Sequence, residues 1–147
     1  MKTGAAVRID AAVLDVRLTE LSRRLKRVAA RRPASLRLLV TDEDLQDILA
    51  RNLEVAIQNC ADIAFHLCAA HRSLPASAGE AFMELGRLGL IDQVLAERLR
   101  LAAGFRNVLV HEYTQIDWKI VLKAVRSGTR DLAAFGKAVV KILDAQA

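Results

Sequence analysis

Apolar residues recur at three- and four-residue intervals along most of the chain, the spacing that places side chains on one face of an α-helix. The first such segment runs from about Val7 to Arg32, and we expect Pro33 to end it because proline cannot continue a helix. Residues 33–41 are then a connection or a short ordered segment rather than a flexible linker. The side chains expected to face the core from the first helix are Ile9, Val13, Val16, Leu21, Leu25 and Val28.

The longest apolar stripe predicts a second helix that ends near Ala70 and lies at the centre of a bundle. Thr41 is the expected N-cap, because Asp44 three residues later resembles the acidic partner of a capping box. Asp62 and His66 lie four residues apart on this helix, and we expect a hydrogen-bonded pair near the surface, with a direct functional role as the second possibility. The stripe consists of Leu45, Ile48, Leu49, Leu53, Ala56, Ile57, Cys60, Ile63, Ala64 and Leu67.

A third, short helix is expected to begin at a capping box formed by Ser77 and Glu80 and to stop at Gly89. Asp92 then caps a fourth helix, which we expect to continue as far as residue 113. Gly104 inside this helix indicates a close approach by the backbone of another helix, because glycine otherwise weakens a helix interior. The packing residues expected on the fourth helix are Val94, Leu95, Leu99, Leu101 and Ala102.

The C-terminal part of the chain predicts two more helices. Asp117 is the expected cap of the first, Gly128 is expected to interrupt it, and Thr129 or Asp131 begins the last. The chain contains no credible strand hairpin, internal repeat or glycine-rich phosphate loop, so the expected fold is one all-α domain. The apolar residues of these two helices are Trp118, Ile120, Val121, Leu122, Val125, Leu132, Phe135, Val139, Ile142 and Leu143.

The composition supports a folded helical domain. The chain has 147 residues, of which 53% are hydrophobic, and these are mostly Leu, Ala and Val, whereas aromatic residues make up only 4%. No apolar run approaches the roughly 20 residues needed to span a bilayer, and no signal-peptide core begins the chain, so export is not expected. Cys60 and Cys68 form no ligand pattern and are expected to be small buried side chains, which suits a reducing cytoplasm.

The net charge of +5 is concentrated at one end of the chain. Residues 1–37 contain ten Lys and Arg against three Asp and Glu, whereas the remaining residues contain twelve against fourteen. A basic face attracts nucleic acid, but an ordinary solvated helix face has the same composition. Charge alone leaves these two interpretations open.

Residues 106–113 combine polar groups that can do chemistry with apolar residues that pack. The stretch contains the only Tyr of the chain and one of its three His. If the helix is continuous, Arg106 and Tyr113 lie on one stripe, and His111 lies one turn after Asn107 on an adjacent stripe. The helix therefore presents Arg, Asn, His and Tyr over a broad polar sector.

An Arg and a His are together suited to metal-independent cleavage of RNA. His titrates near neutral pH and can act as acid or base, Arg holds a phosphate or a developing oxyanion, and RNA supplies its own 2′-hydroxyl nucleophile. Such a pair is nevertheless most often structural, and a two-fold dimer would be needed to supply a second copy of each group. A Cys–His pair is disfavoured because both Cys are expected in the core, and the three His have no convergent carboxylates for a metal site.

The motif and its surroundings resemble the HEPN superfamily, and within it the HepT toxins. The superfamily motif is an Arg, usually followed by a polar residue, with a His a few residues later, and the HepT form adds a Tyr two residues after the His. Residues 102–113 resemble the central signature closely, and the segments 51–57, 62–67 and 116–118 resemble other parts of the family. The likeness covers about residues 8–145. The matching motif positions are Arg106, Asn107, His111 and Tyr113.

The resemblance implies a single HEPN domain over residues 1–147, built as an up-and-down bundle of roughly four to six helices that dimerises through the motif helix. It implies a metal-independent endoribonuclease toxin of a type VII toxin–antitoxin system, without a cofactor of its own. Arg106 and His111 would be catalytic, with Asn107 helping to position them. The implied partner is an MNT-type nucleotidyltransferase antitoxin that uses ATP and Mg²⁺ to adenylylate Tyr113. One departure is Gln58, where many relatives carry Glu.

Two other classes of function remain open at this level. The chain is alternatively a non-catalytic helical subunit that binds a nucleotide or a partner enzyme within a nucleotidyltransferase complex. In that case Arg106 and Tyr113 serve binding, whereas Gln58 weakens catalysis. The third class is a structural helical dimer whose polar sector is only a solvated interface.

Overall fold

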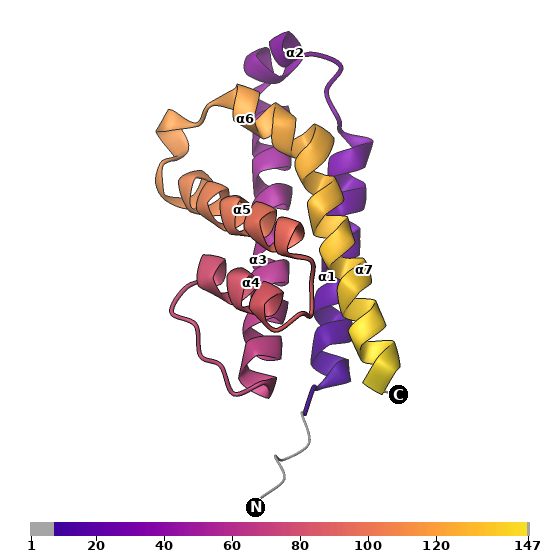
Figure 1. The fold of residues 1–147 in the computed structure, drawn as a ribbon. Helices are drawn as coiled ribbons and strands as arrows, with labels where there is room; N and C mark the ends of the chain where they lie inside the picture. The colour runs from indigo at the N-terminus through magenta and orange to yellow at the C-terminus, as the bar shows by residue number, and fades with distance from the viewer. Residues whose placement is uncertain (1–7, 147) are drawn as a thin grey trace, which may run out of the picture.

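The fold is known from a computed structural model that describes residues 8–146, and the described residues form helices and no strand. Figure 1 shows α1, α3 and α7 running along the long direction of the molecule, with α4 and α5 lying across α3. No described helix is long and apolar enough to cross a membrane. The elements are α1 (Ala11–Ala30), α2 (Leu36–Thr41), α3 (Glu43–Ala70), α4 (Ala78–Arg87), α5 (Gln93–His111), the 3₁₀ helix η1 (Tyr113–Gln115), α6 (Trp118–Lys123), the π-helix η2 (Ala124–Gly128) and α7 (Thr129–Gln146).

The all-α prediction is confirmed, but the expected interruption at Gly128 is wrong. The chain stays helical from α6 through η2 into α7, so that these three elements form one continuous, bent helix (Figure 1). The side chains of Ser127 and Thr129 support the wider π turn by donating hydrogen bonds to the carbonyls of Lys123 and Val125 at 3.0 and 3.1 Å. The change of helical pitch takes the place of a break, because a π turn absorbs an extra residue within a helix.

Helix starts follow local capping chemistry at several of the expected positions. Ser77 and Asp92 cap α4 and α5, and Asp117 caps α6, each by accepting a hydrogen bond from a backbone N–H of the first turn. The expectation for Thr41 is wrong: Asp42 is the cap of α3 and accepts from the Leu45 N–H at 3.0 Å. Thr41 instead belongs to the end of α2, where its hydroxyl donates to a carbonyl of the preceding turn.

The face that α1 presents to the core differs from the expected one. This helix starts after Asp10, and Val7, its expected first residue, lies outside the described residues. Val13 and Val16 are 44% and 67% exposed, because the packed stripe is shifted by one residue along this part of the helix. The stripe packs against α3 with a seven-residue repeat of buried positions. It consists of Leu14, Leu18, Leu21, Leu25 and Val28.

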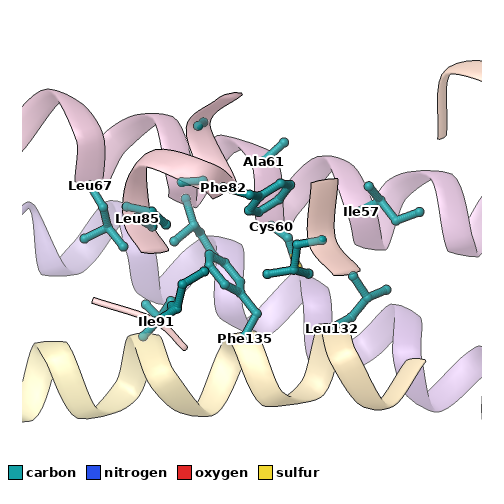
Figure 2. Packing of buried hydrophobic residues seen from close by; sticks show 14 of the residues in the cluster. Ile57, Cys60, Ala61, Leu67, Phe82, Leu85, Ile91, Leu132 and Phe135 are labelled. Carbon is teal, nitrogen blue, oxygen red and sulfur yellow. The ribbon is translucent and has the colours of Figure 1, made fainter. Parts of the chain in front are cut away.

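The hydrophobic core has two clusters, and α5 contributes to both. In the first cluster, side chains of α3, α4 and α7 point toward one another (Figure 2), and the rings of Phe82 and Phe135 pack edge to face with centroids 5.6 Å apart. Cys60 and Cys68 are fully buried there, as predicted, and burial raises the pKa of the Cys60 thiol. The second cluster lies between α2, α3, α6 and the end of α5, where Leu109 is 3% exposed. Anchorage in both clusters fixes the position of α5.

Three further expectations for individual residues are corrected by the packing. Asp62 and His66 do not pair, because Asp62 forms an ion pair with Arg17 at 3.4 Å and His66 Nε2 accepts from the Asp10 N–H at 3.1 Å. Gly104 meets no approaching helix, since a Cβ there would have no atom within 4 Å among the described residues. The side chains of Val94 and Leu101, expected to pack on the fourth helix, are more than half exposed.

Candidate active site

The helix α5 carries Arg106, Asn107 and His111 on a well-anchored backbone. Its N-terminus is capped by Asp92, which accepts from the N–H groups of Val94 and Leu95 at 3.0 and 3.3 Å. Its other face is buried, and the polar motif residues are left at the partly or fully exposed side. The helix ends at His111. The buried residues that hold α5 in place are Ala96, Leu99, Ala103 and Leu109.

Arg106 forms no ion pair with a carboxylate within residues 8–146. Its Nη1 donates only a long hydrogen bond of 3.4 Å to the Asn107 amide oxygen, and its buried Nε finds no acceptor among the residues that the structure describes. Buried donors are normally paired, and an unpaired one at a functional site is often reserved for a ligand. Seven other arginines contrast with it, because each forms an ion pair with an Asp or Glu: Arg17, Arg23, Arg24, Arg51, Arg87, Arg98 and Arg100.

A cleft of about 920 Å³ opens beside Arg106, between α3, α4 and α5. Asn107 and Arg100 line it from α5, and Gln58 lines it from α3. Gln58 carries no charge, and its Nε2 donates to Asp62 at 2.8 Å. On the α4 side, the Arg87 guanidinium lowers the pKa of Glu84 to about 2, so that this ion pair persists at neutral pH. The cleft therefore combines apolar walls with a few polar groups, and Arg106 is a cation there that forms no ion pair in the described part of the chain.

His111 lies apart from this cleft in the single chain. It is exposed at the last position of α5 and is not among the residues that line the cleft. On a regular helix, five residues correspond to about 7.5 Å along the axis and about 140° around it. The structure therefore brings Arg106 and Asn107 together but does not bring His111 into the same pocket.

Tyr113 is not on the stripe of Arg106, because α5 ends before it. The residue belongs to η1, and its hydroxyl donates a short hydrogen bond to the carboxylate of Asp47 on α3, 66 residues away in sequence. This hydrogen bond, followed by burial and by the negative charges of Asp47 and Glu43, raises the pKa of Tyr113 from 10 to about 12. Tyr113 is 47% exposed, so its hydroxyl is bound by Asp47 while much of the residue remains accessible to solvent.

Asp47 is the site residue that sequence reasoning missed. Nothing in its local pattern distinguishes it from the other acids in the first turns of α3, since its role depends on a contact with a distant segment. The described residues contain no group of three or more His, Cys, Asp or Glu side chains arranged to hold a metal ion.

Comparison with known proteins gives a consistent result. Residues 18–139 match the family described as "Ribonuclease HepT-like". An mRNA nuclease HepT from Shewanella oneidensis is 33% identical over 95 residues, which cover 64% of this chain and 71% of that protein. A tRNA nuclease HepT from Aphanizomenon flos-aquae is 30% identical over 118 residues, which cover 80% of each chain.

A solved structure shares the fold over most of its length. It is the tri-AMPylated HEPN toxin of Shewanella oneidensis in complex with an MNT antitoxin, with a TM-score of 0.81 and 26% identity. The superposition covers 88% of this chain and 97% of that toxin. The family match spans most of the chain, and the relatives and the fold agree with it, so this chain belongs to the Ribonuclease HepT-like family.

Proposed function

We propose that this chain is a metal-independent endoribonuclease toxin that acts in the cytoplasm as a single HEPN domain. The observation that carries the proposal is the buried Nε of Arg106, which has no acceptor in the described part of the chain and lies five residues before an exposed His111 on α5. The similar proteins named as mRNA and tRNA nucleases support RNA as the substrate class.

The chemistry assigned to the site is transesterification of the RNA backbone. The 2′-oxygen forms a bond to the adjacent phosphorus, the bond from phosphorus to the 5′-oxygen breaks, and a 2′,3′-cyclic phosphate results. His111 takes the proton of the 2′-hydroxyl or gives one to the departing 5′-oxygen, depending on its protonation state. Arg106 stabilises the charge on the phosphoryl oxygens, and Asn107 holds the guanidinium through its amide oxygen.

A homodimer formed through α5 would complete this site. Two proton transfers are needed for one cleavage, and a two-fold axis beside the motif helix supplies a second His and a second Arg. The side chain of Leu101 on α5 is 60% exposed, and it supports an interface there because a partner would remove it from water.

The partner that neutralises the toxin is an MNT-type nucleotidyltransferase, which transfers adenylyl groups from ATP to Tyr113. Support comes from the similar toxin, which is tri-AMPylated and bound to an MNT antitoxin. The half-exposed Tyr113 ring, two residues after the end of α5, also supports it. A phosphodiester added there would place negative charge beside the catalytic helix and repel RNA.

The direct test is cleavage of RNA by the purified protein in the presence of EDTA. Cleavage is expected for the wild type, with loss of at least about 10²-fold in His111→Ala because general acid–base catalysis contributes that much. His71→Ala, which replaces the histidine that follows the last turn of α3, is the matched control and should cleave normally. Absence of cleavage by the wild type, or unchanged cleavage by His111→Ala, contradicts the proposal.

The alternative function is a non-catalytic subunit that binds a nucleotide or a partner enzyme. The neutral Gln58 in the cleft and the separation of His111 from that cleft favour it. Growth arrest on expression, relieved by Arg106→Ala, would exclude this alternative. Expression without arrest, together with unaltered nucleotidyltransferase binding by His111→Ala, would favour it. No growth arrest and no RNA binding would point to the purely structural dimer.

A further inference from the structure

We propose that Asp47 is a further functional residue: its carboxylate orients the Tyr113 hydroxyl and accepts its proton when a nucleotidyl group is transferred to that oxygen. The inference rests on the proposed modification of Tyr113 and adds to it the group on this chain that prepares the acceptor.

The contact between these two residues is built by packing on both sides of it. Leu45 precedes Asp47 on α3, and Ile116 follows η1, and both are partly buried against the second core cluster. The turn of η1 is closed by the Gln115 N–H, which donates to the Glu112 carbonyl at 2.8 Å. Asp47 and Tyr113 are therefore brought together by neighbouring apolar contacts, and the hydrogen bond does not have to assemble the two segments alone.

The Asp47 carboxylate can accept a proton because no cation among the described residues is paired with it. Within residues 8–146 it forms no ion pair, and the Tyr113 hydroxyl is its side-chain partner. Other carboxylates of this protein differ. Hydrogen bonds from Arg23 and Arg24 lower the pKa of Glu20 to about 2, and Arg87 does the same to Glu84. A carboxylate bound to arginine is a poor base, and Asp47 escapes that limitation.

The Tyr113 hydroxyl requires a base in order to react as a nucleophile. With a pKa of about 12, Tyr113 is almost entirely protonated at neutral pH, so its oxygen is a weak nucleophile. In the transfer, the Tyr113 oxygen forms a bond to the α-phosphorus of a nucleoside triphosphate held by the partner enzyme. The bond between that phosphorus and the bridging oxygen breaks, and pyrophosphate leaves. The phenol proton passes to Asp47 as the oxygen loses electron density, and from there to solvent.

The contact with Asp47 also explains why the Tyr113 side chain would separate from α3 after it is adenylylated. Adenylylated Tyr113 has no proton to donate, and its new phosphodiester is negative. Asp47 and Glu43 both act on the tyrosine as negative charges, so they would repel the product. The free tyrosine is thus held by α3, and the modified one is released from it.

The test compares adenylylation of the full-length chain and its Asp47 variants by a cognate MNT-type nucleotidyltransferase with ATP and Mg²⁺, followed by intact mass. Asp47→Asn keeps an oxygen that can accept the hydrogen bond but cannot take the proton, and should slow the first mass increase by about 10²-fold. Asp47→Glu should recover part of the rate. Asp44→Asn, which removes an equal charge from the first turn of the same helix, should stay within about twofold of the wild type.

A spectroscopic titration separates proton transfer from a change in phenol acidity. Tyr113 is the only tyrosine, so the tyrosinate absorbance reports on it alone. Asp47→Asn should lower the pKa of Tyr113, and acidity by itself would then make the variant react faster rather than slower. A variant that is folded by circular dichroism and is modified at the wild-type rate, or faster, overturns the inference.

The outcomes distinguish this inference from the proposed function. Wild-type protein that cleaves RNA but gains no mass with the nucleotidyltransferase overturns the proposed modification and this inference with it. Wild-type protein that gains mass but does not cleave RNA removes the nuclease proposal, and the Asp47 comparison still decides the inference. Slow modification of Asp47→Asn together with normal modification of Asp44→Asn supports it.

Discussion

Gln58 and Arg106 line the same cleft from α3 and α5. The Gln58 side-chain amide is neutral and donates its hydrogen bond to Asp62, so it offers no negative charge to the Arg106 guanidinium. The Arg106 Nε therefore remains without an acceptor among the described residues. A carboxylate at position 58 would offer a charge-assisted acceptor on that side of the cleft.

We expect Gln58→Glu to increase RNA cleavage by up to about tenfold, equivalent to about 1.4 kcal/mol, because a better-oriented guanidinium stabilises the transition state more strongly. The new acid would also lie one helical turn from Asp62, so a slightly lower melting temperature is expected. Initial rates on one RNA and thermal unfolding measure the two effects. Gln58→Ala is the control, and an equal rise in that variant would show that the carboxylate is not the cause.

Arg106→Lys should be nearly as inactive as Arg106→Ala. Lysine keeps the charge but lacks the planar array of donors that binds phosphoryl oxygens in two places, and each variant is expected to lose about 10²- to 10³-fold in kcat. Neither should lower the free energy of unfolding by more than about 0.5 kcal/mol, because Arg106 makes no ion pair within the described residues that would be lost. Single-turnover cleavage and urea denaturation test this. Full activity of Arg106→Lys would mean that a point charge suffices.

Leu99 and Leu101 lie two positions apart on α5, and truncation of the two side chains should lower the stability of the fold by very different amounts. Leu99 is fully buried, so Leu99→Ala should cost about 2–5 kcal/mol of unfolding free energy. Leu101 is 60% exposed, so Leu101→Ala should cost little in the folding of one chain.

If α5 forms the dimer interface, Leu101→Asp should shift the protein toward monomer in sedimentation and reduce RNA cleavage in parallel. A folded Leu101→Asp dimer with normal activity would place the interface elsewhere.

The pH dependence of stability should show the bond between Tyr113 and Asp47. The folded protein holds the phenol proton more tightly than the unfolded chain, since the pKa of Tyr113 is raised from 10 to about 12. Its contribution to stability is therefore fully present below pH 10 and is lost as the pH rises through 12. Urea denaturation between these two pH values should show a steeper loss for the wild type than for Tyr113→Phe. Parallel curves would indicate that the bond is absent in solution.

Much of this molecule is determined by short-range sequence chemistry. Ser77, Asp92 and Asp117 cap their helices because each side chain meets N–H groups only two or three residues ahead, and such geometry needs no distant partner. The apolar spacing likewise determines the long central helix and its end at Ala70. The motif of Arg106 and His111 was visible for the same reason, since both lie on one helix.

Tertiary structure decided those features for which the local sequence pattern is compatible with more than one arrangement. Periodicity on α1 was compatible with more than one face, and packing against α3 selected the stripe of Leu14 and Leu21 over Val13 and Val16. Tyr113 lies outside α5, in η1, and its hydroxyl contacts Asp47, which is 66 residues away in sequence. Apolar contacts of the second cluster hold η1 close to α3 and so make this contact possible. Contacts of this kind depend on the burial of side chains that are remote in sequence. No repeat or spacing along the chain therefore predicts which acidic residue accepts the hydrogen bond of the Tyr113 hydroxyl.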